Sequence, residues 1–314
     1  MLKEGKDPLE SSSYRPICLL STLSKTLERI IAELMHAHIN DTGCIAPEQF
    51  GFMRNRSTED AIQFIIKRIR TSLPMNTYTV GVLLDIAGAF DNIKWKVVHQ
   101  ELRAKNFPLI ILNIMQDYLR NRTAVSEDCS ISLTYGCPQG SVLGPMLWII
   151  SYDHIIEALQ TPKRTVGCYA DDTVMLVSAN KIDEIQKLVA ESISVAAVLM
   201  EKAGLSLNPG KTEVIVFPGG GGNRTLGKKY NFQALNRTYE SKLAVKYLGA
   251  FNQHFTYLAD KCNKLLPKLL SVCQNVCGYS NETRKLMLDA TIREHLPIRM
   301  HIILPPCVGK PQIN

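Results

Sequence analysis

Apolar residues recur along the chain at helical and strand-like periods, which predicts a mixed α+β fold. Spacings of three and four predict helices over 19–38, 58–70, 93–105, 109–119 and 181–203. In the first of these the apolar positions are Leu23, Leu27, Ile30, Ile31 and Leu34, and Ser21 or Ser24 is the candidate N-cap. A mostly apolar run over 141–159 predicts a further, buried helix.

Shorter β-rich runs alternate with these helices. Residues 79–84 (TVGVLL) predict a buried strand that ends at Asp85. Residues 165–177 contain two such runs around a polar pair, which predicts a hairpin with Ala170, Asp171 and Asp172 at its tip. Short strands are expected at 131–134, 214–217 and 246–249, a tight turn at 136–140 and a flexible link at 218–222.

Composition narrows the class of protein. The chain has 314 residues, 46% of them hydrophobic, and a net charge of +7. This length predicts two or three subdomains of a soluble globular protein. The basic excess favours an anionic partner such as nucleic acid, and a mildly basic enzyme without such a partner is the alternative.

Cysteine spacing and hydropathy argue against a disulfide-rich, zinc-binding, secreted or membrane-spanning protein. The nine cysteines form no CxxC pair, which argues against a disulfide framework or a zinc site and predicts small buried residues in a reduced compartment. Residues 1–13 are polar and charged, unlike a signal peptide. No apolar run approaches the ~20 residues that a membrane span needs, so no membrane partner is expected.

The predicted strands place three carboxylates at strand ends. Asp85 ends one strand, and Asp171 and Asp172 lie at a hairpin tip, so rigid backbone can hold them at fixed separation. Carboxylates that face one another repel unless cations lie between them, and Mg²⁺ prefers oxygen ligands. Two such ions can activate an attacking oxygen and stabilise a leaving one. For an Asp-Asp pair taken alone, a solvated turn is the more common explanation.

The neighbouring residues favour a nucleotide site. The small residues at 87–89 allow backbone amides to approach a triphosphate, and Phe90 can place a flat ring near the sugar. The loop that contains Gln139 and Gly140 can contact a base and a template. Phe90 as a core residue and Gln139 as a turn residue remain the alternatives.

Seven segments in this order resemble the reverse transcriptases of non-LTR (LINE-like) retrotransposons of the R1, LOA and Jockey branches. They are YRPICLLSTLSKTLERI (14–30), EQFGFMRNRST (48–58), VLLDIAGAFD (82–91), GCPQGSVLGP (136–145), YADD (169–172), LNPGKTEVIVF (207–217) and KYLGAF (246–251). The resemblance implies an RNA-directed DNA polymerase that uses an RNA template, a DNA primer and dNTPs. It also implies an intracellular protein that acts in the nucleus during target-primed copying.

The resemblance assigns roles to individual residues. Asp85 and Asp171, assisted by Asp172 and by the backbone carbonyl of Ile86, would bind two Mg²⁺ ions, with Mn²⁺ as a substitute. Phe90 would reject the ribose 2′-OH. The nucleotide site would also include Ala89, Gln139, Gly140, Lys211 and Arg54. For Lys211, a surface charge is the alternative.

The implied architecture is the right-hand polymerase fold. A reverse transcriptase domain would span 1–253, with fingers up to about 77 and again at 95–135, and with an antiparallel palm sheet that carries the aspartates. A partial or degraded helical thumb would span 254–314. Its basic helix (Lys261, Lys264 and Lys268) would follow duplex phosphates or form an ordinary solvated face.

The chain departs from the family pattern at two places. The family reads G-F-R in its second fingers segment, with that Arg on the triphosphate, whereas Met53 follows Phe52 here and Arg54 is the candidate substitute. The tail 293–314 does not fit a thumb. A truncated, inactive remnant that retains nucleic-acid binding is therefore the competing hypothesis, and a metal phosphohydrolase is a third. The sequence does not set the oligomeric state.

Overall fold

The computed structural model describes residues 7, 9–10, 14, 17–72, 77–125, 130–218, 229–248 and 250–251. The chain divides into two compact units, Met1–Leu248 and Gly249–Asn314. The described part of the second unit is β12 (Ala250–Phe251). The predicted thumb at 254–314, with its three lysines, lies outside the described residues, as does most of the predicted link at 218–222. The domain boundary at 253 stays a prediction.

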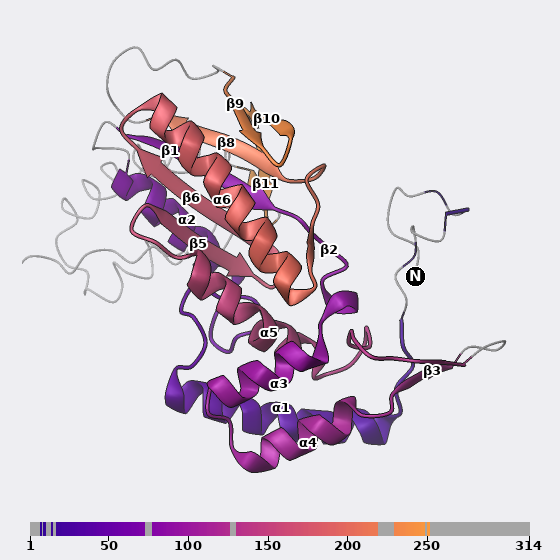
Figure 1. Ribbon diagram of the computed structural model, residues 1–314. Helices are drawn as coiled ribbons and strands as arrows, with labels where there is room; N and C mark the ends of the chain where they lie inside the picture. Colours follow the sequence, from indigo (N-terminus) through magenta and orange to yellow (C-terminus); the bar gives the residue numbers. More distant parts are fainter. Residues whose placement is uncertain are drawn as a thin grey trace, which may run out of the picture. The chain divides into compact units, whose positions relative to one another are not determined.

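A six-stranded sheet forms the centre of the first unit (Figure 1). Its strand order is β5-β6-β1-β8-β10-β9, and every neighbouring pair is antiparallel except β8 with β10. The bounds are β1 (Tyr78–Leu84), β5 (Arg164–Tyr169), β6 (Asp172–Ala179), β8 (Glu213–Pro218), β9 (Asn231–Ala234) and β10 (Arg237–Lys242). The predicted strand at 79–84, the hairpin at 165–177 and the strand at 214–217 are confirmed.

Helices cover both faces of this sheet (Figure 1). Along β6, Val174 and Leu176 pack with Ile65 of α2 (Thr58–Ser72) on one face. The alternate residues Met175 and Val177 belong to the main core, which includes residues of α5 (Gly144–Leu159) and α6 (Ile182–Ala203). Because successive strand residues point to opposite faces, the middle of β6 is apolar and buried on both sides.

Three further helices pack below α5 in Figure 1: α1 (Thr22–Thr42), α3 (Trp95–Ala104) and α4 (Leu109–Leu119). Met35, Leu102 and Met115, one from each helix, are fully buried in the main core. Ser21 caps α1 by accepting a hydrogen bond from the Ser24 amide, as predicted. The helix expected at 93–105 begins two residues later, at Trp95, and the one expected at 141–159 begins at Gly144.

The apolar repeat of α1 identified a helix but not its buried side. Leu23, Leu27, Ile30 and Leu34 are largely exposed, with Leu23 at 81%. The buried side consists of Glu28, Ile31, Ala32, Met35 and Ile39. Periodicity measures how residues repeat around the axis, and the partner that covers a face is set by tertiary packing.

Short elements complete the described fold. β2 (Ile86–Ala87) pairs with β7 (Ser206–Leu207), and β3 (Thr123–Val125) pairs with β4 (Ser130–Ser132), which replaces the strand expected at 131–134. A 3-10 turn, η3 (Phe90–Asn92), follows β2, and β11 (Lys246–Tyr247) lies within the predicted strand at 246–249. Among the described residues, no helix has the length and apolar character of a membrane span.

Candidate active site

Strand register brings the three predicted aspartates to one end of the sheet. The pairing of β1 with β6 ends at Leu84↔Thr173, so Asp85 and Asp172 are the next residues on the two strands. In the hairpin, Tyr169 pairs with Asp172, which leaves Ala170 and Asp171 as its turn. Residues far apart in the sequence therefore meet because two antiparallel pairings share β6.

The carboxylates at this end of the sheet influence one another. Partial burial and the negative charges of Asp171 and Asp85 raise the pKa of Asp172 above its usual value. The Lys211 ammonium lies 3.7 Å from Oδ2 of Asp85 and supplies one compensating positive charge. Both side chains are partly exposed, so water screens this pair and leaves negative charge at the site.

A cavity of about 420 Å³ is lined in part by Asp171. Four of the predicted site residues line it, namely Phe90, Gln139, Gly140 and Asp171, together with Pro138, Ser141, Gly144 and Pro145. The Phe90 ring lies 5.7 Å from the Trp148 ring and 6.0 Å, edge to face, from that of Phe52. These aromatic neighbours hold Phe90 at the wall of the cavity.

Hydrogen bonds join the two loops that line this cavity. The Gln139 side-chain amide donates to Oδ1 of Asp91 (3.0 Å), and the Cys137 amide donates to the Phe90 carbonyl (3.0 Å). The Trp95 indole donates to the Gly136 carbonyl (2.8 Å). The segment after Asp85 and the segment around Gln139 are therefore held at one separation.

The buried carboxylate of Glu28 supports the same loop from α1. Its Oε2 accepts hydrogen bonds from the Ser141 hydroxyl (2.9 Å) and the Val142 amide (2.6 Å), and its Oε1 accepts one from the Tyr118 hydroxyl (3.1 Å). Sequence reasoning missed Glu28, because a Glu in an amphipathic helix usually faces water. The available signal was its place on the same side as Ile31 and Met35.

The second fingers-like segment supports the hairpin tip. Gln49 is fully buried, and its side-chain oxygen accepts hydrogen bonds from the amides of Gly51 (3.0 Å) and Ala170 (3.3 Å). A Cβ on Gly51 would lie 2.0 Å from the Ala170 nitrogen. Only glycine permits this approach, so the backbone beside Asp171 rests directly on residues 49–51.

The remaining predicted residues do not line the cavity. Arg54 pairs with Glu33 of α1, and Met53 packs half-buried against the main core. Ala89 and Ile86 are buried, and Ile86 pairs with Leu207. The structure therefore does not bring Arg54 to the cavity, because a nearer carboxylate holds its guanidinium.

The donor set at the sheet end suits a hard cation. Three carboxylates offer oxygen ligands, and burial together with the charges of Asp171 and Asp85 raises the pKa of Asp172, a cost that a divalent ion would reduce. Within the part of the chain that the structure describes, no three His, Cys, Asp or Glu side chains form a complete metal-binding group. The residues fit the ion in chemical type, and their side chains would have to converge around it.

Comparison with known proteins identifies the relatives of this chain. A family model described as reverse transcriptase (RNA-dependent DNA polymerase) matches residues 2–251. A putative 115 kDa protein in the type-1 retrotransposable element R1DM of Drosophila melanogaster is 28% identical over 90% of this chain. The RNA-directed DNA polymerase from the mobile element jockey of Drosophila funebris is also 28% identical over 90%.

The chain spans only part of these relatives, 28% of the R1DM protein and 32% of the jockey polymerase. Among solved structures, similarity extends to a telomerase from Candida albicans in complex with a TWJ fragment of telomeric RNA. That match covers 74% of this chain and 38% of the telomerase chain, at 13% identity and a TM-score of 0.46.

Proposed function

Because the chain belongs to the reverse transcriptase (RNA-dependent DNA polymerase) family, we propose that it catalyses RNA-templated DNA synthesis during the copying of a non-LTR retrotransposon. The α+β fold has a mainly antiparallel sheet between helices, as expected for the palm and fingers of a polymerase of this family. The observation that carries the proposal is the position of Asp85, Asp171 and Asp172 at one end of the sheet, where Asp171 lines a cavity together with Phe90 and Gln139.

The proposed reaction is nucleotidyl transfer. The primer 3′-hydroxyl gives its proton to solvent and its oxygen attacks the α-phosphorus of a dNTP, so that a P–O bond forms and the bond to pyrophosphate breaks. Asp85, Asp171 and Asp172, with the Ile86 carbonyl, would hold two Mg²⁺ or Mn²⁺ ions. These ions would lower the pKa of the attacking hydroxyl and neutralise charge on the leaving pyrophosphate.

The cavity residues select and orient the nucleotide in this proposal. Phe90, fixed by Trp148, would contact the sugar and exclude a ribose 2′-OH. Gln139, fixed by Asp91, would hold the base together with Gly140. The buried backbone at Ala89 and the ammonium of Lys211 would contact the triphosphate, and Lys211 could then protonate pyrophosphate.

The proposed partners follow from the reaction. They are an RNA template, a DNA primer and dNTPs, and the proposed place of copying is the nucleus, during target-primed copying. In the first test the purified chain is incubated with dNTPs, and the template, the primer or the divalent ion is left out in turn. Extension that requires the template, the primer and a divalent ion supports the polymerase, whereas template-independent dNTP hydrolysis would indicate a phosphohydrolase.

The fingers favour one competing function. Met53 carries no charge and packs against the core, and the Arg54 guanidinium is paired with Glu33. Neither position therefore offers a free cation to a triphosphate in this structure. A remnant that binds nucleic acid without extending it would have this feature. Salt-sensitive RNA binding with no extension in Mg²⁺ or Mn²⁺ would support the remnant and contradict the polymerase.

A further inference from the structure

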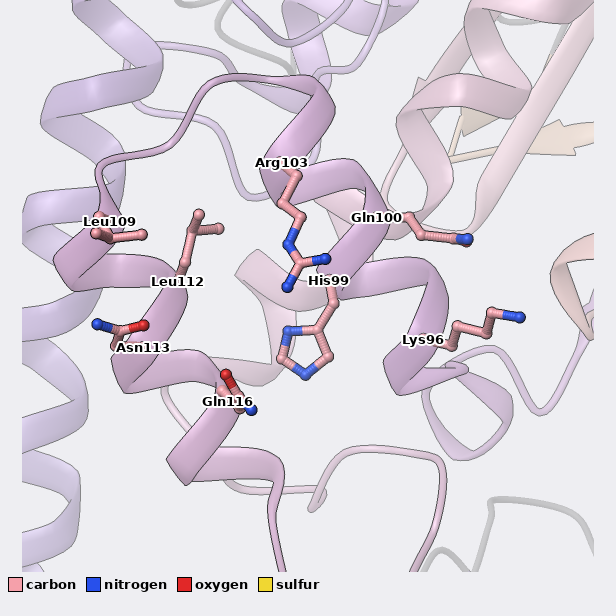
Figure 2. Close-up of a pocket in the computed structure, with 8 residues that line it drawn as sticks. All are labelled: Lys96, His99, Gln100, Arg103, Leu109, Leu112, Asn113 and Gln116. Atoms are coloured by element: carbon pink, nitrogen blue, oxygen red, sulfur yellow. The ribbon is translucent and has the colours of Figure 1, made fainter.

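A second cavity, of about 480 Å³, lies between α3 and α4 and contains none of the proposed polymerase residues. Polar side chains from both helices line it (Figure 2): Lys96, His99, Gln100 and Arg103 from α3, and Asn113 and Gln116 from α4. Their spacings of three, four and seven place them on one side of each helix. We call this cavity the α3–α4 groove.

The charged side chains that line the groove, Lys96 and Arg103, are both cations. Lys96 and Arg103 are exposed, and neither has an acidic partner within ion-pair distance among the described residues. Glu101, the acidic residue of α3, pairs instead with Lys105 and His154. A groove with two uncompensated cations and no lining carboxylate in the described chain attracts anions.

The other lining groups match a nucleotide better than a simple ion. Burial and the nearby charge of Arg103 lower the pKa of His99, so at neutral pH it offers an uncharged flat ring. Gln100, Asn113 and Gln116 provide amide donors and acceptors, and Leu109 and Leu112 add an apolar wall. Single-stranded nucleic acids are bound by this combination of cations, flat rings and amides.

The groove is connected to the polymerase site through α3. The helix begins at Trp95, whose indole donates to the Gly136 carbonyl at the base of the Gln139 loop. Lys94 and Tyr135 form a further β-bridge at this junction. The helix that presents Lys96 is therefore fixed to the loop that lines the first cavity.

We propose that the α3–α4 groove binds a single-stranded segment of RNA, with Lys96 and Arg103 on its phosphates and the amides on its riboses. Only the identity of the strand as RNA rests on the proposed function. An RNA has 2′-hydroxyl groups that can pair with Gln100, Asn113 and Gln116, which a DNA strand lacks.

The test compares two double variants of the full chain. Lys96→Gln/Arg103→Gln removes both groove charges, and Lys187→Gln/Lys202→Gln removes two exposed charges from α6 as the matched control. Binding to a fluorescent single-stranded RNA, and to a DNA of the same sequence, is measured over a range of KCl concentrations. Circular dichroism verifies that both variants fold.

The groove variant should bind the RNA about tenfold more weakly, and its plot of log K against log[KCl] should be shallower by about 1.4, for two lost phosphate contacts. The control should retain the wild-type slope. A photo-crosslinkable RNA should attach to peptides within 96–116. Equal affinities and slopes for the two variants, DNA bound as tightly as RNA, or a poly-Glu peptide that displaces the RNA would overturn the proposal.

Binding is measured without catalysis, so this result is separate from the polymerase test. An Asp171→Ala variant should lose extension and keep the groove-dependent binding. If wild type fails to extend a primer while the groove variant loses RNA binding, the proposed function fails and the groove assignment stands.

Discussion

The buried carboxylate of Glu28 and the hydroxyl of Ser141, 2.9 Å apart, join the first helix to the loop that lines the proposed nucleotide pocket. The same carboxylate accepts hydrogen bonds from the Val142 amide and the Tyr118 hydroxyl. A carboxylate that accepts from these three donors fixes their positions, and replacing one of its oxygens would remove an acceptor from them.

Glu28→Gln should therefore weaken both the fold and the pocket. One carboxylate oxygen becomes an NH2 group that faces donors, which should cost about 2–3 kcal/mol of unfolding free energy. The KM for dNTP should rise by more than kcat falls, since the loop is displaced and the aspartates are not. Urea unfolding and steady-state extension measure these effects, and Arg29→Gln, at the exposed neighbouring position, should change neither.

Gly51→Ala should disrupt the hairpin tip. The new Cβ would need the space of the Ala170 backbone, 2.0 Å away, so Asp171 must move. A shift of about 1 Å predicts a loss of about 100-fold in kcat. Gly43→Ala is the control, because its φ of 62° makes alanine strained but its Cβ meets nothing within 4 Å. It should cost about 1 kcal/mol and leave kcat unchanged, and equal kcat values for the two variants would contradict the packing of Gly51.

Asp172 should make stability depend on pH and on divalent ions. Its pKa is raised in the fold, so ionisation of Asp172 costs the folded state free energy as pH rises from the unfolded-state pKa through the folded-state value. Asp172→Asn removes this cost and should raise the melting temperature at pH 7 without divalent ions by roughly 1–2 °C. The difference should vanish below pH 4 and shrink in Mg²⁺. A lower melting temperature for the variant at pH 7 without divalent ions would argue against repulsion among the aspartates.

Asp153 should be essential for stability. It is fully buried, its Oδ2 pairs with the Lys105 ammonium, and its Oδ1 accepts a hydrogen bond from the Ala46 amide (2.8 Å). Burial alone would lower the pKa of Lys105, but the hydrogen bond and charge of Asp153 outweigh burial and raise it. This contribution is present at neutral pH and is lost as pH rises through the folded-state pKa of Lys105.

Asp153→Asn should therefore cost about 3 kcal/mol, since the ammonium of Lys105 loses its hydrogen-bonded carboxylate and keeps only the more distant ones of Glu101 and Glu157. Chemical denaturation at pH 7 measures the loss. Glu157→Gln is the control, because that side chain is 59% exposed and lies 4.0 Å from Lys105. A change of under 1 kcal/mol is expected there, and a similar value for Asp153→Asn would show that the pair is dispensable.

Local sequence patterns predicted the elements that carry the aspartates. The run that ends at Asp85 and the two runs around Asp171 have β-rich, apolar signatures, and each forms the expected strand or hairpin. The hairpin β9–β10 was not predicted. Its turn depends on Leu235 and Asn236 with φ of 50° and 57°, and a Leu gives little signal for that conformation.

Local sequence patterns could not predict the residues that hold the site in place. Glu28, Gln49 and Gly51 act through contacts with residues more than a hundred positions away. Arg54 was predicted at the nucleotide site, but its guanidinium pairs with Glu33 of α1, and Arg54 does not line the cavity. Sequence spacing predicts the residue types of a site, whereas these pairings are set by the packing of separate elements.

The most direct test of the central claim is single-nucleotide extension of a DNA primer on an RNA template in Mg²⁺ by wild type, Asp85→Asn, Asp171→Asn and Asp117→Asn. Both active-site variants should lose roughly 10³-fold or more in rate, because each removes a ligand of the ions that stabilise the transition state. Asp117, exposed on α4, should be replaceable without loss. Extension by Asp85→Asn or Asp171→Asn at the wild-type rate would contradict the claim that these carboxylates form the reaction centre.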